Sequence, residues 1–96
     1  MENRTPIILC CGDNGRAVVF GWADSFPEAG EPVKLERARM ILYWSADTGG
    51  LFGLAKNGPA AGSRVTAPVE MLIETNWQEA LLVSEEAASK IDGWAA

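Results

Sequence analysis

The sequence predicts a mostly β or α+β domain, built as a small antiparallel sheet or barrel of about six strands with one short C-terminal helix. Two patterns indicate this class. Short apolar runs alternate with turns rich in Gly, Pro, Asn and Asp along most of the chain, and a Ser-Glu-Glu-Ala helix start lies near its end. The 96 residues are enough for one hydrophobic core, so we expect a single domain over residues 1–96.

The first expected element is a β-hairpin. Its strands are residues 7–11 and 16–22, and the turn is Asp13-Asn14-Gly15. Asn and Gly tolerate the positive φ that tight hairpin turns require. The stretch ADSFPEAGEP that follows is rich in turn residues and is expected to form a surface loop.

The next expected strands differ in how clearly the pattern defines them. Residues 32–35 open a third strand, residues 36–39 fit either a strand or a helical turn, and residues 40–44 form the most apolar strand candidate. Segments 16–22 and 40–44 are apolar on both faces, whereas a strand with one wet face alternates apolar with polar. A closed barrel, a covering helix with loops, or a subunit interface would cover the second face, and we expect a homo-oligomer.

The second half begins with a segment, residues 51–55, that fits a short strand or one helical turn. The Gly- and Pro-rich loop KNGPAAGS follows, and strand character resumes at residues 64–67, 69–76 and 77–83. Alternation in the second of these strands separates Val69, Met71 and Ile73 from Glu70, Leu72 and Glu74. The face with the two glutamates is expected to be the wet one, with Leu72 exposed on it.

The expected C-terminal helix begins after Ser84. The Ser84 hydroxyl can accept a hydrogen bond from a free backbone N–H of the first turn, where the helix dipole also favours the negative charge of Glu85 and Glu86. Gly93 is placed to end the helix in a left-handed conformation. The apolar stripe of this helix is Ala87, Ala88 and Ile91.

The cysteines and the apolar runs predict a cytoplasmic protein. Cys10 and Cys11 are neighbours on a strand, point to opposite faces and cannot easily bridge each other, so we expect two reduced, buried thiols. A reactive thiol and an intermolecular disulfide are the alternatives. No apolar run approaches the ~20 residues of a membrane helix, and the N-terminal apolar run is too short for a signal peptide. We therefore expect no membrane partner.

The formal net charge of −5 is concentrated near the C-terminal end. Residues 1–69 hold equal numbers of basic and acidic side chains. The excess negative charge lies in residues 70–96, where Lys90 is the only basic residue. The acidic residues of this range are Glu70, Glu74, Glu79, Glu85, Glu86 and Asp92. This balance argues against direct nucleic-acid binding, which requires clustered cations. The acidic flank either attracts a basic partner surface or serves only solubility.

The residue types give no support to catalysis. The sequence has no histidine, which excludes Ser-His-Asp and Cys-His mechanisms and imidazole metal ligands. Two adjacent cysteines cannot form a four-ligand zinc site. Asp13, Asp24 and Asp47 lie in expected turns, where aspartates usually bind backbone. We therefore expect a non-enzymatic protein with no metal or cofactor.

The loop KNGPAAGSR has the residue types of a small anion site. Backbone amides and two cations could hold a nucleotide-type ligand, but the Walker pattern and its following helix are absent, and a simple hairpin loop is the alternative. The candidate ligand residues are Lys56, Asn57, Gly58, Gly62, Ser63 and Arg64. The aromatic residues lie in apolar runs without flanking cations, so they are expected in the core or a subunit interface.

The segment ARMILYWSADTGGLFGLAKNGPAAGSRVTAPVEM, followed by the Ser-Glu-Glu-Ala helix start, resembles a family of small uncharacterised proteins of tailed phages and prophages. The similarity spans roughly residues 33–88. It implies a phage accessory protein acting inside an infected bacterium, and it assigns no residue a role.

Three functional hypotheses follow. In the first, the chain binds a host or defence protein through Leu72 and the acidic flank of Glu70, Glu74, Glu79, Glu85 and Glu86. In the second, an oligomer sequesters an anionic nucleotide-type ligand through the KNGPAAGSR loop. In the third, the chain is a structural or assembly protein of the virion.

Overall fold

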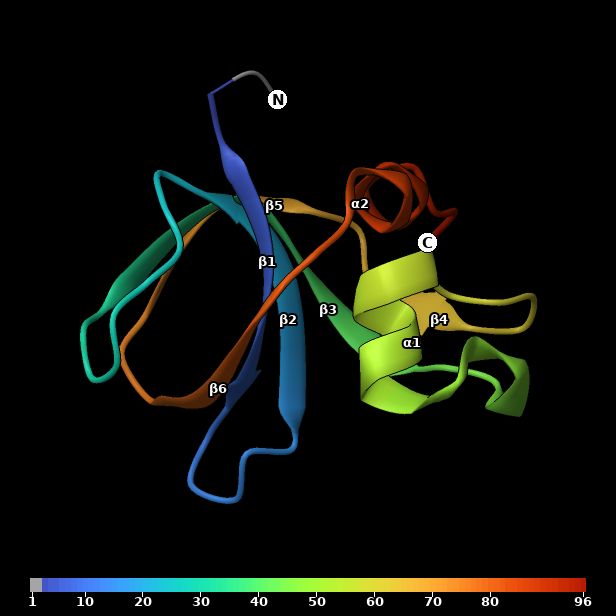
Figure 1. Cartoon of the computed structure of the whole chain (residues 1–96), viewed down its shortest axis with the longest axis horizontal. Coiled ribbons are helices and arrows are strands. Elements are labelled where there is room, and N and C mark those ends of the chain that lie inside the picture. The colour runs from blue at the N-terminus through green and yellow to red at the C-terminus, as the bar shows by residue number, and fades with distance from the viewer. Residues whose placement is uncertain (1–2) are drawn as a thin grey trace.

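A computed structural model describes residues 3–96 and confirms the predicted class, with six antiparallel strands and two short α-helices in this range (Figure 1). The elements are β1 (Thr5–Cys11), β2 (Ala17–Ala23), β3 (Val33–Tyr43), the 3₁₀ turn η1 (Ala46–Thr48), α1 (Gly50–Asn57), β4 (Arg64–Val65), β5 (Val69–Glu74), β6 (Trp77–Leu82) and α2 (Glu85–Asp92). Neither α-helix is long and apolar enough to cross a membrane.

The sheet curls so that its inner face encloses one part of the core. Its strand order is β4-β3-β2-β1-β6, and β5 pairs with β3 beside β4. Because β5 continues almost directly into β6, one segment of chain joins the two ends of the sheet. The inner cluster accordingly combines side chains of five strands, among them Ile7, Val19, Leu35, Leu72 and Trp77.

The two helices cover the outer face of the central strands. Figure 1 shows α1 and α2 together on one side of the sheet. The cluster beneath them includes Ile8, Phe20, Ile41, Leu54 and Ile91. Strands β1 and β2 are therefore apolar on both faces because one face lines the curled sheet and the other lies under helices. The expected homo-oligomer stays a prediction.

The cysteines lie as the alternation predicts. Cys10 belongs to the helix-covered cluster and Cys11 to the inner cluster, and both are buried free thiols. Burial, reinforced by a hydrogen bond and the charge of Glu74, raises the pKa of Cys11 to about 12. The thiol is therefore neutral at physiological pH and a poor nucleophile.

Strand β3 is continuous through the ambiguous residues 36–39, but it contains a bulge. Arg37 has a φ of 50°, and the register with β2 shifts between Phe20 and Trp22. A bulge adds one residue to one strand and re-aims the side chains beside it. Here Arg37 and Arg39 both reach α2.

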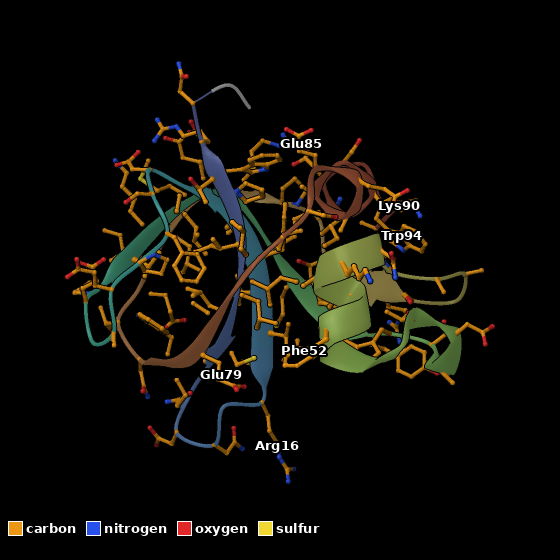
Figure 2. The ribbon with its side chains drawn as sticks, in the orientation of Figure 1. Arg16, Phe52, Glu79, Glu85, Lys90 and Trp94 are labelled. Atoms are coloured by element: carbon orange, nitrogen blue, oxygen red, sulfur yellow. The ribbon has the colours of Figure 1, made fainter. Side chains whose placement is uncertain are left out.

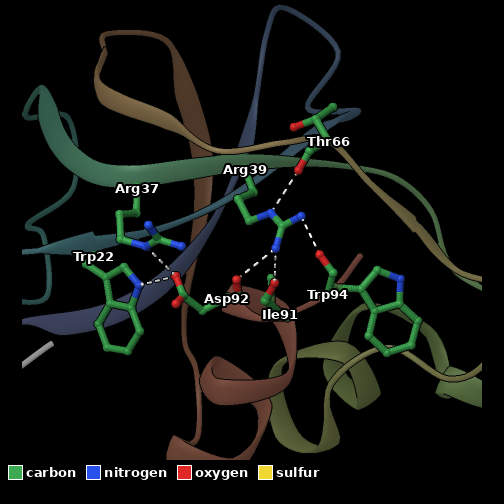
Figure 3. Close-up of polar contacts among 7 residues, drawn as sticks. All are labelled: Trp22, Arg37, Arg39, Thr66, Ile91, Asp92 and Trp94. Carbon is green, nitrogen blue, oxygen red and sulfur yellow. Dashed lines mark hydrogen bonds and ion pairs between the residues drawn. The ribbon is translucent and has the colours of Figure 1, made fainter. Parts of the chain in front are cut away.

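Arg39 binds the C-terminal end of α2 from the side of the sheet (Figure 3). Its side chain is 3% exposed. One Nη donates to the carbonyls of Ile91 and Asp92 at 2.7 and 2.9 Å, the other to that of Trp94 at 2.6 Å, and Nε to that of Thr66 at 2.8 Å. The bonds to Ile91 and Asp92 reach carbonyls at the helix end, where intrahelical donors run out, and the bonds to Thr66 and Trp94 join the neighbouring segments to the same side chain.

The prediction that Gly93 ends α2 in a left-handed conformation is wrong. Gly93 has a φ of −95°. A left-handed residue is useful where the backbone itself must satisfy the last carbonyls of a helix. At this helix the guanidinium of Arg39 supplies donors for that purpose, and the chain continues without the left-handed turn.

The segment of uncertain type, residues 51–55, is part of helix α1. Gly49 precedes the helix with a φ of 86°, and a Cβ on Gly53 would lie 2.0 Å from the Thr48 carbonyl oxygen. Glycine at position 53 therefore allows the first turn of α1 to lie close against η1.

The expected exposure of β5 is reversed. Leu72 is partly buried in the inner cluster, opposite Leu35, whereas Met71 is 48% and Ile73 63% exposed. Glu70 and Glu74 share the inner-facing side with Leu72 but lie toward the two ends of the strand. Their carboxylates reach water there, while the residue between them packs inside.

Candidate functional site

An apolar groove of about 400 Å³ lies between α1 and β6. Helix α1 contributes Phe52, Ala55 and Lys56 to it. The end of β6 and the residues after it contribute Leu81, Leu82, Val83 and Ser84. Exposed apolar grooves of this kind commonly bind ligands or partner segments.

The exposed part of the groove is formed by two large side chains. Phe52 is 77% and Leu82 62% exposed. Helix α1 packs on the sheet through its Leu54 and Ala55 side, which leaves Phe52 outside the buried stripe. Figure 2 shows Phe52 projecting from α1 toward the strands.

One end of the groove is fixed by hydrogen bonds around Ser84. Its backbone N–H donates to the carbonyl of Ala55 at 3.0 Å, and its hydroxyl donates to the carbonyl of Lys56 at 2.6 Å. The same hydroxyl accepts from the Ala87 N–H, which confirms the predicted helix cap. The end of α1 and the start of α2 are thereby held together beside β6.

Strand β6 has a free edge. It is the terminal strand of the sheet and pairs only with β1 among the described residues, and it passes in front of β1 in Figure 1. The N–H and C=O groups on its other edge have no strand partner within residues 3–96. Such an edge is a template for pairing with another extended segment.

The charges around the groove are sparse and opposite at its two ends. Lys56 lies at the Ser84 end, and Glu79 lies earlier on β6, on the same face as Leu81. Burial raises the pKa of the Cys10 thiol beside Glu79, with a further contribution from that carboxylate. The groove offers apolar contact, strand pairing and charge complementarity, and its nearest thiol is protonated.

The acidic residues predicted as a partner surface do not form one surface. Glu70 and Glu74 flank Leu72 on β5, and the Glu74 carboxylate accepts from the Asn76 N–H at 2.9 Å. Glu79 lies on β6, whereas Glu85 and Glu86 begin α2. Figure 2 shows Glu79 and Glu85 on opposite sides of the view. The predicted apolar contact of this flank, Leu72, is turned inward.

The residues predicted for an anionic ligand also diverge. Lys56 and Asn57 end α1, and Gly58 packs against Lys90 and Ala87 of α2. Ser63 is buried, with its hydroxyl bound by the Ser45 N–H and its carbonyl by the Trp94 indole. Gly62 lies in the loop before it, and Arg64 pairs across the sheet with Tyr43. Within residues 3–96 no group of His, Cys, Asp or Glu is suited to hold a metal ion.

Sequence reasoning missed the groove because it left residues 51–55 undefined. If that segment is helical, Leu51, Leu54 and Ala55 share one face and Phe52 falls outside it. The uninterrupted run Leu81-Leu82-Val83 is the second available signal, since a run without polar residues at a strand end places one side chain outward.

A family model described as "Domain of unknown function (DUF6948)" matches residues 4–91. The chain belongs to the DUF6948 family. The matched range runs from the start of β1 into the last turn of α2, so the DUF6948 domain includes the whole groove. No curated protein and no solved structure matches the chain.

Proposed function

We propose that the chain is a non-enzymatic accessory protein of a tailed phage or prophage that binds a host or defence protein through the α1–β6 groove. The observation that carries the proposal is the exposure of Phe52 and Leu82 over an apolar groove next to a free strand edge. Covering these two side chains removes apolar surface from water, at roughly 25 cal/mol per Å². The phage setting comes from the sequence resemblance.

The partner segment is extended and adds to β6 as an antiparallel strand. Backbone hydrogen bonds to β6 give affinity, and alternate side chains of the segment enter the groove. Because β6 runs from Glu79 toward Ser84, an antiparallel segment begins near Lys56 and ends near Glu79. The expected order in the partner is an acidic residue, then apolar residues, then a basic residue.

Selection from a random peptide library tests this binding mode. The wild-type chain is expected to enrich extended peptides with the acidic–apolar–basic order. For a selected peptide, fluorescence anisotropy should show binding weakened at least about tenfold by Phe52→Ser, because the ring forms much of the groove wall. Lys56→Glu should remove the preference for the acidic residue.

Phe26→Ser is the matched control, because Phe26 is an exposed phenylalanine in the loop between β2 and β3. It should leave the affinity unchanged. Capture from infected cells with wild type, Phe52→Ser and Phe26→Ser extends the test to the natural partner, which Phe52→Ser should lose and Phe26→Ser should keep. Equal binding by wild type and Phe52→Ser would show that the groove is not the binding surface.

A further inference from the structure

A second cleft, of about 560 Å³, lies between α2 and the strands β1 and β2. One wall is a face of α2 on which residues three, four and seven positions apart come together. The residues of this wall are Glu85, Ala88, Ser89 and Asp92. Opposite them are Pro6 and Trp22, which are cross-strand neighbours, and Arg4 also lines the cleft.

The indole of Trp22 is held in a fixed orientation. Its N–H donates to Oδ1 of Asp92 at 3.2 Å (Figure 3), and its ring meets the buried ring of Phe20 edge-on, with centroids 5.7 Å apart. A ring fixed in this way is ready to bind before a ligand arrives, which lowers the entropy cost of binding.

The two carboxylates of the cleft have free acceptor capacity. Oδ1 of Asp92 accepts from Trp22 and from Arg37 at 2.9 Å, but Oδ2 makes no hydrogen bond within residues 3–96. Glu85, two helical turns earlier, makes no ion pair or side-chain hydrogen bond in the same range. The two carboxyl-bearing residues are thus about 10 Å apart along the helix axis.

The surrounding cations balance the charge of Asp92 but not that of Glu85. Arg4 is paired with Asp24 and with Glu36, the latter at 2.9 Å. Arg37 pairs with Asp92, and the charge of Arg39 also acts on that carboxylate. Glu85 and the neighbouring Glu86 make no ion pair among the described residues, so the field at the Glu85 end of the cleft favours a positive ligand.

We propose that this cleft binds an organic cation, an ammonium or guanidinium group carried on an aliphatic stem. The stem packs on Pro6 and Ala88, and the charged head lies between the indole face of Trp22 and the carboxylate of Glu85. Aromatic rings attract such cations, and carboxylates accept their hydrogen bonds. A free amine and a Lys or Arg side chain of another protein present the same chemistry. The proposal does not depend on the α1–β6 groove.

Titration of the full chain by NMR tests the site. Butylguanidinium and butylammonium represent free cations, the N-acetyl methylamides of arginine and lysine represent protein side chains, and butyrate is the control of opposite charge. The cations should shift the indole N–H of Trp22 and the amides of Ala88 and Ser89, and butyrate should not. If the amino-acid derivatives bind more tightly, the ligand is a side chain of another protein. If the free cations bind more tightly, the ligand is a small organic cation.

Two adjacent glutamates provide the matched variants. Glu85→Gln should weaken cation binding about threefold, as for a partly exposed ion pair, whereas Glu86→Gln, outside the cleft, should not. Trp22→Leu should lose binding, and Trp22→Phe should keep part of it if the ring face is the contact. Equal effects of the two glutamine variants, or shifts by butyrate at the same resonances, would overturn the proposal, and so would the absence of shifts with every cation.

Discussion

Strands β1 and β2 are covered on both faces, whereas β5 is covered on one. Ile8 and Phe20 lie under the helices while Ile7 and Val19 face the inner cluster. On β5 the inner residue Leu72 packs, but Met71 and Ile73 on the other face remain largely in water. Similar apolar strands thus have two uses in one sheet, as core in the centre and as exposed surface on β5.

The length of the helices explains this difference. Helices α1 and α2 have eight residues each, which corresponds to about 12 Å of helix. Together they cover the outer face of the central strands, with Val65 and Leu81 at the margins of the same cluster, and they leave the outer side of β5 free. The groove and the cleft both lie where this cover ends, one beside each helix.

Truncation of the doubly covered strands should have the largest effect on stability. Phe20→Ala should lower the free energy of unfolding by about 3–5 kcal/mol, because the ring is fully buried beneath the helices. Phe26→Ala, in the exposed loop, should change it by less than about 0.5 kcal/mol. Urea denaturation followed by tryptophan fluorescence measures both values, and similar values for the two would contradict the assignment of the core.

Substitution of Arg39, which binds the end of α2, should have the second-largest effect on stability. Arg39→Met should lower the free energy of unfolding by about 2–4 kcal/mol, because buried helix carbonyls lose their donors. Arg39→Lys should retain only part of this stability, since an ammonium cannot reproduce the planar arrangement of donors of a guanidinium. Hydrogen exchange should accelerate in α2 first, and unchanged exchange there would contradict the role of Arg39.

Two neighbouring residues of β5 test the one-sided cover directly. Leu72→Ala should cost about 2 kcal/mol, because Leu72 packs in the inner cluster. Ile73→Ala should cost less than about 0.5 kcal/mol, because Ile73 is mostly in water. Thermal or urea unfolding measures the pair, and the reverse order would restore the outward-facing Leu72 that the sequence predicts.

Removal of the Asp92 carboxylate should have the smallest effect on stability. Asp92→Asn should lower the free energy of unfolding by about 1 kcal/mol at pH 7. Burial raises the pKa of Asp92. Hydrogen bonds from Arg37 and Trp22, together with the charges of Arg37 and Arg39, outweigh that effect, so the pKa lies below its ordinary value. The stabilisation is therefore present above about pH 4 and is lost as the pH falls through the lowered pKa. Unfolding of both proteins between pH 7 and 2 should show the difference closing at acid pH.

The local features of the fold were predictable. The turn at Asp13-Asn14-Gly15 and the cap at Ser84 depend on a few neighbouring residues, and both are confirmed. The bulge at Arg37 was not predictable, because a positive φ at an arginine has no signal in the sequence. The two-sided apolar strands correctly indicated that both faces are covered, without deciding how.

The candidate sites were harder to predict, because exposure depends on curvature. Alternation along β5 identified its two faces correctly, but charge placed the wrong one in water. In a curled sheet the ends of an inner face open to solvent, so Glu70 and Glu74 remain hydrated while Leu72 packs between them. A groove or cleft between elements distant in the chain, such as α1 and β6, has no contiguous sequence pattern.

The contacts of Arg39 also determine how the chain folds. The arginine and the helix end that it binds are more than 50 residues apart, at 52 positions for Ile91. An isolated helix of eight residues is unstable in water. Sheet and helix should therefore unfold in one cooperative step, and closure of this long-range loop should slow refolding.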